Sequence, residues 1–244
     1  MSRLLGVLSL GMAAGTLVGC ATAGTFQTAS TVGEDNFQLG VEPSIVGISG
    51  SGDLTALTSA GDETGSASGY FPTASISARY GITDTSEIGG RLGPGGLELL
   101  TKFQFTDPDS DGAVISLAPS ISGFVAGGGG VSGGLVNVVV PLLIGMPSGE
   151  SNELVLGPKV VDTIVFADDN GSNSRAHIVW VGSTVGYSAQ LGDRLKLLPE
   201  FGLLYPAVGW ASASGDGESD SGSGALGGFV TWQAGLGFLI GQTR

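Results

Sequence analysis

The sequence predicts an all-β fold, a single antiparallel transmembrane β-barrel of about ten strands, with eight and twelve as alternatives. Three observations predict it. Apolar and polar residues alternate with a period of two along most of the chain, short turns alternate with longer loops, and aromatic residues gather near both ends of the expected strands. A barrel with lipid on one side of its wall and a polar interior on the other has all three properties.

The alternation is clearest in two segments. In residues 37–45, Phe37, Leu39, Val41 and Ile45 alternate with polar or small residues, and residues 70–80 repeat the pattern. Because successive side chains of a strand point to opposite sides, each segment has one apolar and one polar face. Further strands are predicted near residues 86–93, 97–106, 113–125, 134–145, 153–167, 176–189, 194–206 and 227–240.

The connections differ in length in a regular way. Short turns rich in Gly, Asp, Asn and Ser are expected at 81–85, 107–112, 146–152 and 190–193, and longer loops at 49–69, 126–133, 168–175 and 209–226, with 93–96 as a short exception. In outer-membrane barrels the short turns face the periplasm. An even number of strands therefore places both chain ends on the periplasmic side.

Aromatic residues prefer the two membrane–water interfaces. The residues near the loop ends of the expected strands are Tyr70, Phe71, Phe124, Phe166, Trp180, Tyr205, Trp210 and Phe229, and those near the turn ends are Phe37, Tyr80, Phe103, Phe105, Tyr187 and Phe238. Two aromatic girdles are predicted.

Charge and cysteine content exclude several classes of function. The chain has 244 residues with 9 Lys+Arg, 22 Asp+Glu and a formal net charge of −13. Such a charge repels nucleic acid, so no nucleic-acid partner is expected. A single cysteine excludes an intrachain disulfide framework and a cysteine-rich zinc site. No cofactor is predicted.

The N-terminus has the features of an export signal. A short basic start is followed by an apolar run, and Leu17-Val18-Gly19-Cys20 closes it. This quartet resembles the lipobox of bacterial lipoproteins. The resemblance implies that residues 1–19 are removed, that the Cys20 sulfur carries a diacylglyceryl group, and that Ala21 directs the protein to the outer membrane. An ordinary signal peptide with a coincidental cysteine, and an uncleaved anchor, are the alternatives.

These features divide the chain into three parts. Residues 1–19 form the lipoprotein signal peptide, residues 20–35 the lipidated N-terminus and a tether of small polar residues, and residues 36–244 the barrel. As a whole, the chain resembles the small lipid-anchored outer-membrane β-barrel proteins of Gram-negative bacteria. The resemblance implies that the protein lies in the outer membrane with its anchor on the periplasmic side and membrane lipid as a partner.

Charged residues inside the expected strands lie on the faces opposite the apolar stripes. They are Glu42, Arg79, Glu87, Arg91, Glu98, Lys102, Lys159, Lys196 and Glu200. Five basic and four acidic residues nearly balance, so we expect an ion network that fills the barrel or, alternatively, a charged constriction of a pore. Asp162 breaks the alternation set by Lys159, which predicts a bulge or a shifted register in that strand.

The sequence contains two weaker candidate sites. His177, the only histidine, lies near Asp168 and Asp169 and could act as a general base with Ser172, Ser174 or Ser183 as partner. No sequence arrangement fixes that geometry, so no catalytic residue is predicted. Asp107, Asp109 and Asp111 begin like a calcium loop, but Ala118 stands where the bidentate Glu belongs, so they are a weak metal candidate.

The sequence favours a non-enzymatic outer-membrane protein with a structural or surface-interaction role. The expected external loops are acidic, with Asp53, Asp62, Glu63, Asp168, Asp169, Asp216, Glu218 and Asp220, and they could bind divalent cations or bridge to lipopolysaccharide. A narrow pore for ions or small solutes is the runner-up. A lipid-anchored periplasmic β-sandwich or ligand-binding barrel, with the apolar stripes turned inward, is the third interpretation.

Overall fold

The structure, a computed structural model, describes residues 23–53, 64–108, 111–128, 131–149, 151–169, 172–215, 218–224 and 228–241. Its strands are β1 (Phe37–Asp53), β2 (Thr64–Thr83), β3 (Ser86–Gly93), β4 (Gly96–Gln104), β5 (Val114–Leu117), β6 (Ser120–Gly128), β7 (Val131–Pro147), β8 (Glu153–Asp169), β9 (Ser172–Gly192), β10 (Leu195–Gly215), β11 (Glu218–Gly224) and β12 (Phe229–Gly241). Among these residues no helix is long and apolar enough to cross a membrane.

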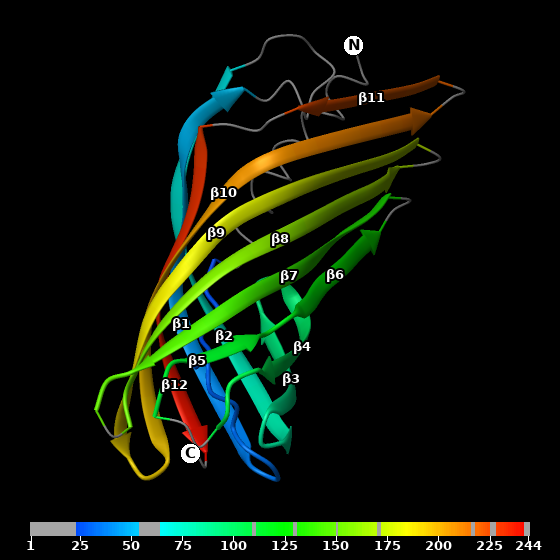
Figure 1. The fold of residues 1–244 in the computed structure, drawn as a ribbon. Coiled ribbons are helices and arrows are strands. Elements are labelled where there is room, and N and C mark those ends of the chain that lie inside the picture. Colours follow the sequence, from blue (N-terminus) through cyan, green and yellow to red (C-terminus); the bar gives the residue numbers. More distant parts are fainter. Residues whose placement is uncertain are drawn as a thin grey trace.

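The strands form one closed antiparallel sheet. β1 pairs with both β2 and β12, and β10 pairs with β9 and β12, so the first strand meets the last (Figure 1). β5 and β6 each pair with β4 and β7 and together act as one strand, interrupted at Ala118 and Pro119. β11 pairs with β10 as a hairpin extension. Within the described residues the barrel therefore has ten strands, which confirms the predicted fold.

The expected loops are shorter than the sequence suggested. β1 and β2 stay paired up to Asp53 and Thr64, and β10 and β11 pair from Gly209 to Gly224. Residues of these segments are mostly small and carry no apolar alternation, yet their main-chain amides and carbonyls pair with each other across the two strands of each hairpin. β3 and β4 instead end at the tight turn beside Gly93, so the wall is low there. Residues 54–63, part of the expected loop 49–69, lie outside the described residues.

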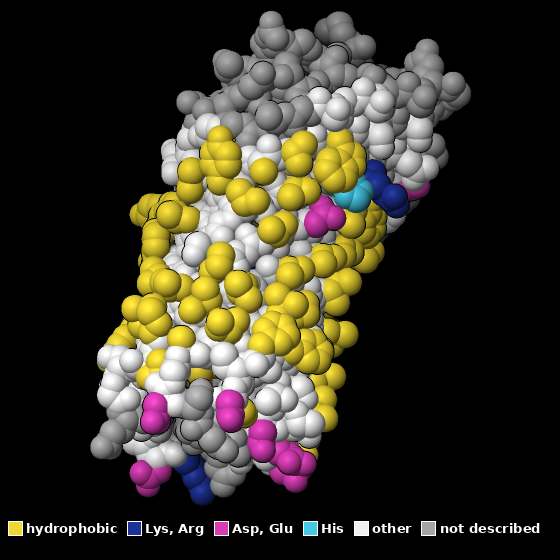
Figure 2. Space-filling view, in the orientation of Figure 1, with side chains coloured by type: hydrophobic (Ala, Val, Ile, Leu, Met, Phe, Trp, Pro, Cys, Tyr) yellow, Lys and Arg dark blue, Asp and Glu magenta, His cyan; other side chains and the backbone are white. Residues whose placement is uncertain are grey.

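The apolar stripes face outward. Leu39 is 46% and Val41 44% exposed, whereas Gln38 and Glu42 between them are buried. Figure 2 shows the consequence on one face, a wide band of hydrophobic side chains with charged side chains beyond it at the lower end. Glu34, Asp107 and Asp193, in or beside the turns, are exposed. The interpretation with inward-turned apolar stripes, a periplasmic sandwich or ligand-binding barrel, is therefore wrong.

The N-terminal part of the described chain lies inside the barrel. Residues 23–36, called the lumen segment below, run through the interior to the turn end, where β1 begins (Figure 1). Most of the segment is buried, and Ala23 and Ala29 are fully so. The small polar residues of 20–35 predicted a tether. The described part of that range fills the lumen instead.

Candidate functional site: the barrel lumen and the segment inside it

The lumen collects the charged residues that the sequence placed opposite the apolar stripes. All nine face inward and are no more than 8% exposed: Glu42, Arg79, Glu87, Arg91, Glu98, Lys102, Lys159, Lys196 and Glu200. They come from six strands, β1, β2, β3, β4, β8 and β10, because period-two alternation points one face of every strand at the axis. A tenth charged residue of the lumen, Glu153, was not predicted from the sequence because it is the first residue of its strand. It has the same parity as buried Val155.

Part of this set forms ion pairs. Arg91 Nε lies 3.0 Å from Glu42 Oε2, and Arg91 Nη1 lies 3.1 Å from Glu98 Oε2. Lys102 Nζ lies 2.9 Å from Glu87 Oε1. Buried charges are tolerated only when partners replace the lost hydration. These ion pairs leave many donor and acceptor atoms of the charged side chains without a partner in the wall. The main chain of the lumen segment supplies partners for them.

At its upper end the segment is held by β8, β10 and β12. Lys159 Nζ donates to the carbonyl of Ala23, and the amide of Gly24 donates to Gln233 Oε1 at 2.7 Å. The Glu200 carboxylate accepts from the amide of Thr25, from its hydroxyl at 2.8 Å, and from the amide of Phe26 at 2.9 Å. A single buried carboxylate thus binds two successive amides.

Two arginines hold the next carbonyl groups. Arg91 donates to the Thr25 carbonyl and Arg79 Nη2 to the Phe26 carbonyl at 2.9 Å. Arg79 also donates from Nη1 to Gln38 Oε1 at 3.1 Å. The guanidinium has several donors in a planar fork, so each arginine donates both to side chains of the wall and to a carbonyl of the segment.

The lower half is bound in the same way. The amides of Ala29, Thr31 and Val32 donate to Glu153 Oε1, Gln104 Oε1 and Glu87 Oε2 at 3.2, 3.1 and 2.8 Å. The carbonyls of Ala29 and Ser30 accept from Ser116 Oγ and Lys102 Nζ at 2.5 and 3.1 Å. The segment forms no strand, so side chains of the wall supply the partners that a sheet ladder would give.

Glycines of the wall make room for the segment. A Cβ on Gly202 would lie 2.2 Å from the Ala23 carbonyl oxygen, and one on Gly235 would lie 2.7 Å from the Phe26 ring. Phe26 itself has a φ of 48°. This left-handed conformation is uncommon for a residue with a side chain and fits its tight confinement.

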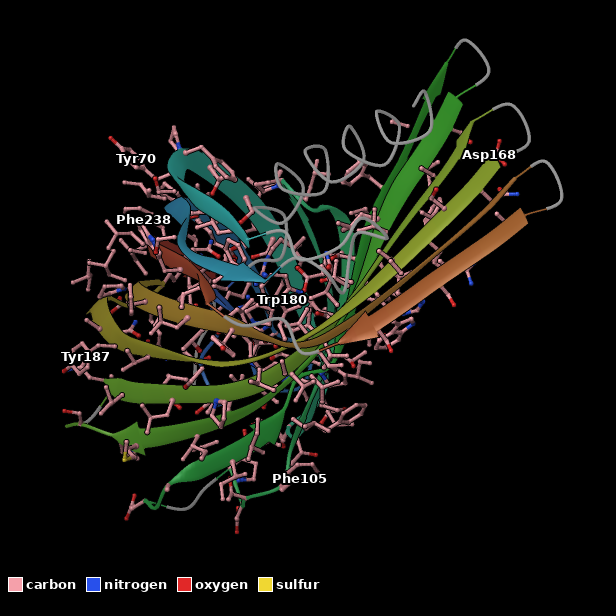
Figure 3. All side chains as sticks on the ribbon, turned by 90° about the horizontal axis from the view of Figure 1, so that it is seen from above. Tyr70, Phe105, Asp168, Trp180, Tyr187 and Phe238 are labelled. Carbon is pink, nitrogen blue, oxygen red and sulfur yellow. The ribbon has the colours of Figure 1, made fainter. Side chains whose placement is uncertain are left out.

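Above the segment the interior is packed by mixed side chains. Ala23 joins Val161, Ile178, Trp180 and Leu204 in one buried cluster. Trp180 is 2% exposed, donates to Thr163 Oγ1 at 3.1 Å, and points toward the barrel centre in Figure 3. Its predicted place in the outer aromatic girdle is therefore wrong. Tyr70 and Tyr187 lie on the outside as predicted, 75% and 38% exposed.

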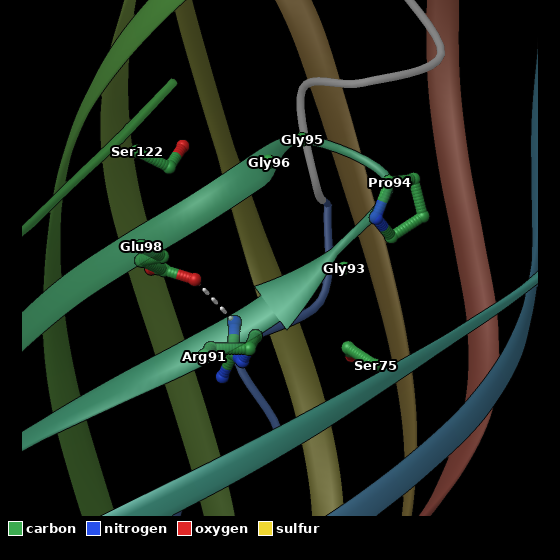
Figure 4. A pocket seen from close by; sticks show the side chains of 8 residues that line it. All are labelled: Ser75, Arg91, Gly93, Pro94, Gly95, Gly96, Glu98 and Ser122. Atoms are coloured by element: carbon green, nitrogen blue, oxygen red, sulfur yellow. Dashed lines mark hydrogen bonds and ion pairs between the residues drawn. The ribbon is translucent and has the colours of Figure 1, made fainter. Parts of the chain in front are cut away.

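A small pocket opens where the wall is low, at the turn between β3 and β4. It is lined by Ser75, Arg91, Gly93, Pro94, Gly95, Gly96, Glu98 and Ser122 (Figure 4). The Arg91–Glu98 ion pair forms its floor. This is a place where the luminal charges approach the loop end of the barrel.

Asp162 and His177 lie on the outer face of the wall. The register of β8 shows no shift against β7 or β9, so the expected bulge is wrong and Asp162 points outward. Its Oδ1 lies 3.8 Å from His177 Nδ1, and the His177 ring stacks on Trp210 with centroids 4.7 Å apart. Ser183 shares this outer face but lies six positions along β9, too far for a hydrogen bond to His177.

The weak metal candidate remains a prediction. Asp107 and Asp111 are exposed near the turn after β4, while Asp109 lies outside the described residues. Among the described residues no group of three or more His, Cys, Asp or Glu side chains is placed to hold a metal ion. Cys20 and residues 1–19, the expected signal peptide, also lie outside the described residues.

Comparisons with known proteins give only distant structural likenesses. No family model and no curated protein sequence matches the chain. Solved structures that it resembles include the outer membrane protease OmpT from Escherichia coli, with 11% identity, coverage of 90% of this chain and 100% of that chain, and a TM-score of 0.48. Others are the translocator domain of autotransporter NalP from Neisseria meningitidis (12%, 97% and 93%, 0.43) and the outer membrane protein OprG from Pseudomonas aeruginosa (11%, 88% and 99%, 0.39). Similarity of this degree says nothing about activity, so the function is inferred from the residues of this chain.

Proposed function

We propose that this protein is an outer-membrane β-barrel whose lumen is closed by its own N-terminal segment and that it has a structural or surface-interaction role rather than an enzymatic one. The observation that carries the proposal is the lumen segment, whose main chain is bound by charged side chains from around the wall. An open pore would need this space for water and solute.

The outer surface supports a membrane location. Exposed large apolar residues occur on strands all around the barrel, among them Leu39, Ile76, Leu99, Val160 and Leu203. Contiguous apolar surface of this extent is rare on soluble monomers, and an outward apolar band is the mark of a transmembrane barrel. The short turns would face the periplasm, and the extended hairpins of β7–β11 would reach outward from the cell.

Planar-bilayer recording tests the proposal. We expect the purified full-length protein, shown to be folded by a gel mobility that changes on boiling, to give no discrete channel openings. Frequent openings from such folded protein would contradict closure and would favour the narrow pore. Openings lost when Arg79, Arg91 and Lys102 are neutralised would locate that pore in the lumen.

A narrow pore is a second candidate because, apart from its peptide link to β1, the described part of the segment is held in the lumen by noncovalent contacts. Its contacts with the lumen are hydrogen bonds to side chains, and the pocket beside Arg91 and Glu98 lies at the loop end of the lumen. Removal of the segment would leave a passage lined by matched charges. A pore of this kind would open only when the segment leaves.

Lipid attachment at Cys20, which we also propose, is linked to this closure. The chain from Ala23 to Cys20 spans at most about 11 Å. Ala23 packs against Val161, and the distance along β8 from Val161 to the turn end at Glu153 is about 20 Å for strands tilted by about 40°. Acyl chains on Cys20 therefore reach the periplasmic leaflet only if the upper part of the segment leaves the lumen.

Acidic residues at the loop end support a weak interaction with divalent cations or lipopolysaccharide. Asp168 lies at the tip of the β8–β9 hairpin (Figure 3), and Asp53 and Glu218 lie at other strand ends on that side. Carboxylate oxygens are the ligands that such cations prefer. If the interaction holds, EDTA will change the thermal stability of the protein in lipopolysaccharide-containing membranes, and an unchanged stability would contradict it.

A further inference from the structure

We infer that the lumen is a binding site for a polypeptide segment without regular secondary structure, which it recognises by its main chain, with residues 23–32 as the resting occupant. The inference rests on the proposed closure of the lumen and goes one step further, because it names the class of ligand. That class is a polypeptide of mainly small residues, with one large apolar side chain at the place of Phe26, whose buried ring lies against Gly235.

The contacts divide sharply between main chain and side chain. Luminal side chains bind the amides of Gly24, Thr25, Phe26, Ala29, Thr31 and Val32 and the carbonyls of Ala23, Thr25, Phe26, Ala29 and Ser30. Among residues 23–32, all of them described, only Thr25 and Thr31 are recorded with side-chain hydrogen bonds to the barrel as well. Every residue except proline offers the same amide and carbonyl, so such contacts carry little sequence information.

Gln27 gives independent support. Its side chain is 3% exposed, and its Oε1 makes no hydrogen bond within the described part of the chain. A site shaped to read this sequence would be expected to satisfy a buried amide oxygen, since leaving it unpaired costs about 1–3 kcal/mol. The neighbouring main-chain groups are bound, whereas this side-chain group is not.

The wall is shaped for a close-lying backbone. A Cβ on Gly202 would meet the Ala23 carbonyl, and one on Gly145 would lie 2.8 Å from Ala29 Cβ. These contacts limit the size of the occupant's side chains without selecting their chemistry. Acidic side chains of the lumen accept hydrogen bonds from amides, and basic side chains donate to carbonyls. A polypeptide main chain presents amides and carbonyls in alternation.

Hydrogen exchange of the segment amides tests the inference in full-length protein that carries Cys20→Ser, so that no acyl chain draws Ala23 out of the lumen. This non-acylated protein is the wild-type reference in each exchange experiment on the segment. A variant with Thr25→Val, Gln27→Met, Thr28→Val and Thr31→Val keeps size and main chain but removes polar side-chain atoms. We expect its segment amides to remain protected within about threefold of the wild type, because the main-chain bonds persist. Loss of protection by more than about tenfold, with the barrel amides still protected, would overturn main-chain recognition.

Two glycine variants form a matched pair. Gly202→Ala places a methyl group against the Ala23 carbonyl and should raise exchange at the start of the segment by about tenfold or more. Gly133→Ala, at the same strand parity as buried Leu135 and Asn137, would meet Phe166 and Ala167 instead and should leave the segment unchanged. Equal effects from both would contradict the inference. If the wild-type segment exchanges as fast as a free peptide, the proposed closure itself fails, which is a distinct outcome.

Discussion

Glu200 is the residue whose replacement should weaken the binding of the lumen segment most directly. Its carboxylate accepts hydrogen bonds from the Thr25 amide, the Thr25 hydroxyl and the Phe26 amide while fully inside the barrel. Glu200→Gln keeps the shape but offers a single acceptor oxygen. One of the two amides then loses its partner, and the remaining bonds lose their charge assistance.

The magnitude follows from these losses. An unpaired buried amide costs about 1–3 kcal/mol, and a neutral hydrogen bond is weaker than a charged one by about 1 kcal/mol. The free energy that holds the segment in the lumen should therefore fall by about 2–4 kcal/mol, or roughly 30- to 700-fold in the equilibrium constant between bound and released segment. Removal of the negative charge near Lys159 acts in the same direction.

Hydrogen exchange measured on peptides that cover residues 23–36 checks this prediction, with strands β8 and β9 as internal references. Asn137→Leu is the control, because Asn137 is buried in the lumen but bonds to Ser122 and Thr163 rather than to the segment. We expect fast exchange in Glu200→Gln and unchanged segment protection in Asn137→Leu. Exchange in Glu200→Gln within about twofold of the wild type, in a folded barrel, would refute the reasoning.

Three further predictions follow from other parts of the molecule. In membranes, protein that mass spectrometry shows to be acylated at Cys20 should expose the amides near Ala23 to hydrogen exchange, whereas Cys20→Ser protein should protect them. Equal protection in both would show that the acyl chains can reach the leaflet while the segment stays in the lumen, which contradicts the prediction. Asp162→Val removes a charge from the apolar outer face and should stabilise the folded barrel by about 1 kcal/mol in urea titrations in lipid, and a loss of stability would show that the pair with His177 is favourable. Tyr80→Phe removes the 2.7 Å hydrogen bond to Asp35 and should destabilise the barrel by about 0.5–1 kcal/mol, with Tyr187→Phe as a comparison.

Sequence alternation predicted the barrel wall well, and the reason is local. In a strand the side of the wall that a residue faces depends only on its parity, so Leu39 and Val41 could be assigned to the outside and Glu42 to the inside without knowledge of any partner. The same rule identified the charged residues that line the lumen. Applied strictly, it also places Asp162 outside, and the expected bulge was an unnecessary correction of a regular strand.

The hairpin extensions were harder to predict because their stability comes from pairing rather than from patterning. Residues 209–224 have small side chains, and no apolar stripe distinguishes them from a loop. Trp180 was misplaced for a related reason. Its position near a strand end suggested the interface, while its parity, shared with buried Ile178, sends it into the lumen.

The sequence by itself determined the positions of most strands, the outward apolar band and the charged inner face, because each depends on neighbours one or two residues away. Only the tertiary structure decided what fills the lumen. Gly24, Thr25 and Val32 find their partners 209, 175 and 55 residues away, on strands that meet only when the barrel closes. A segment without periodicity, bound through its main chain, leaves no pattern in the sequence to show where it lies.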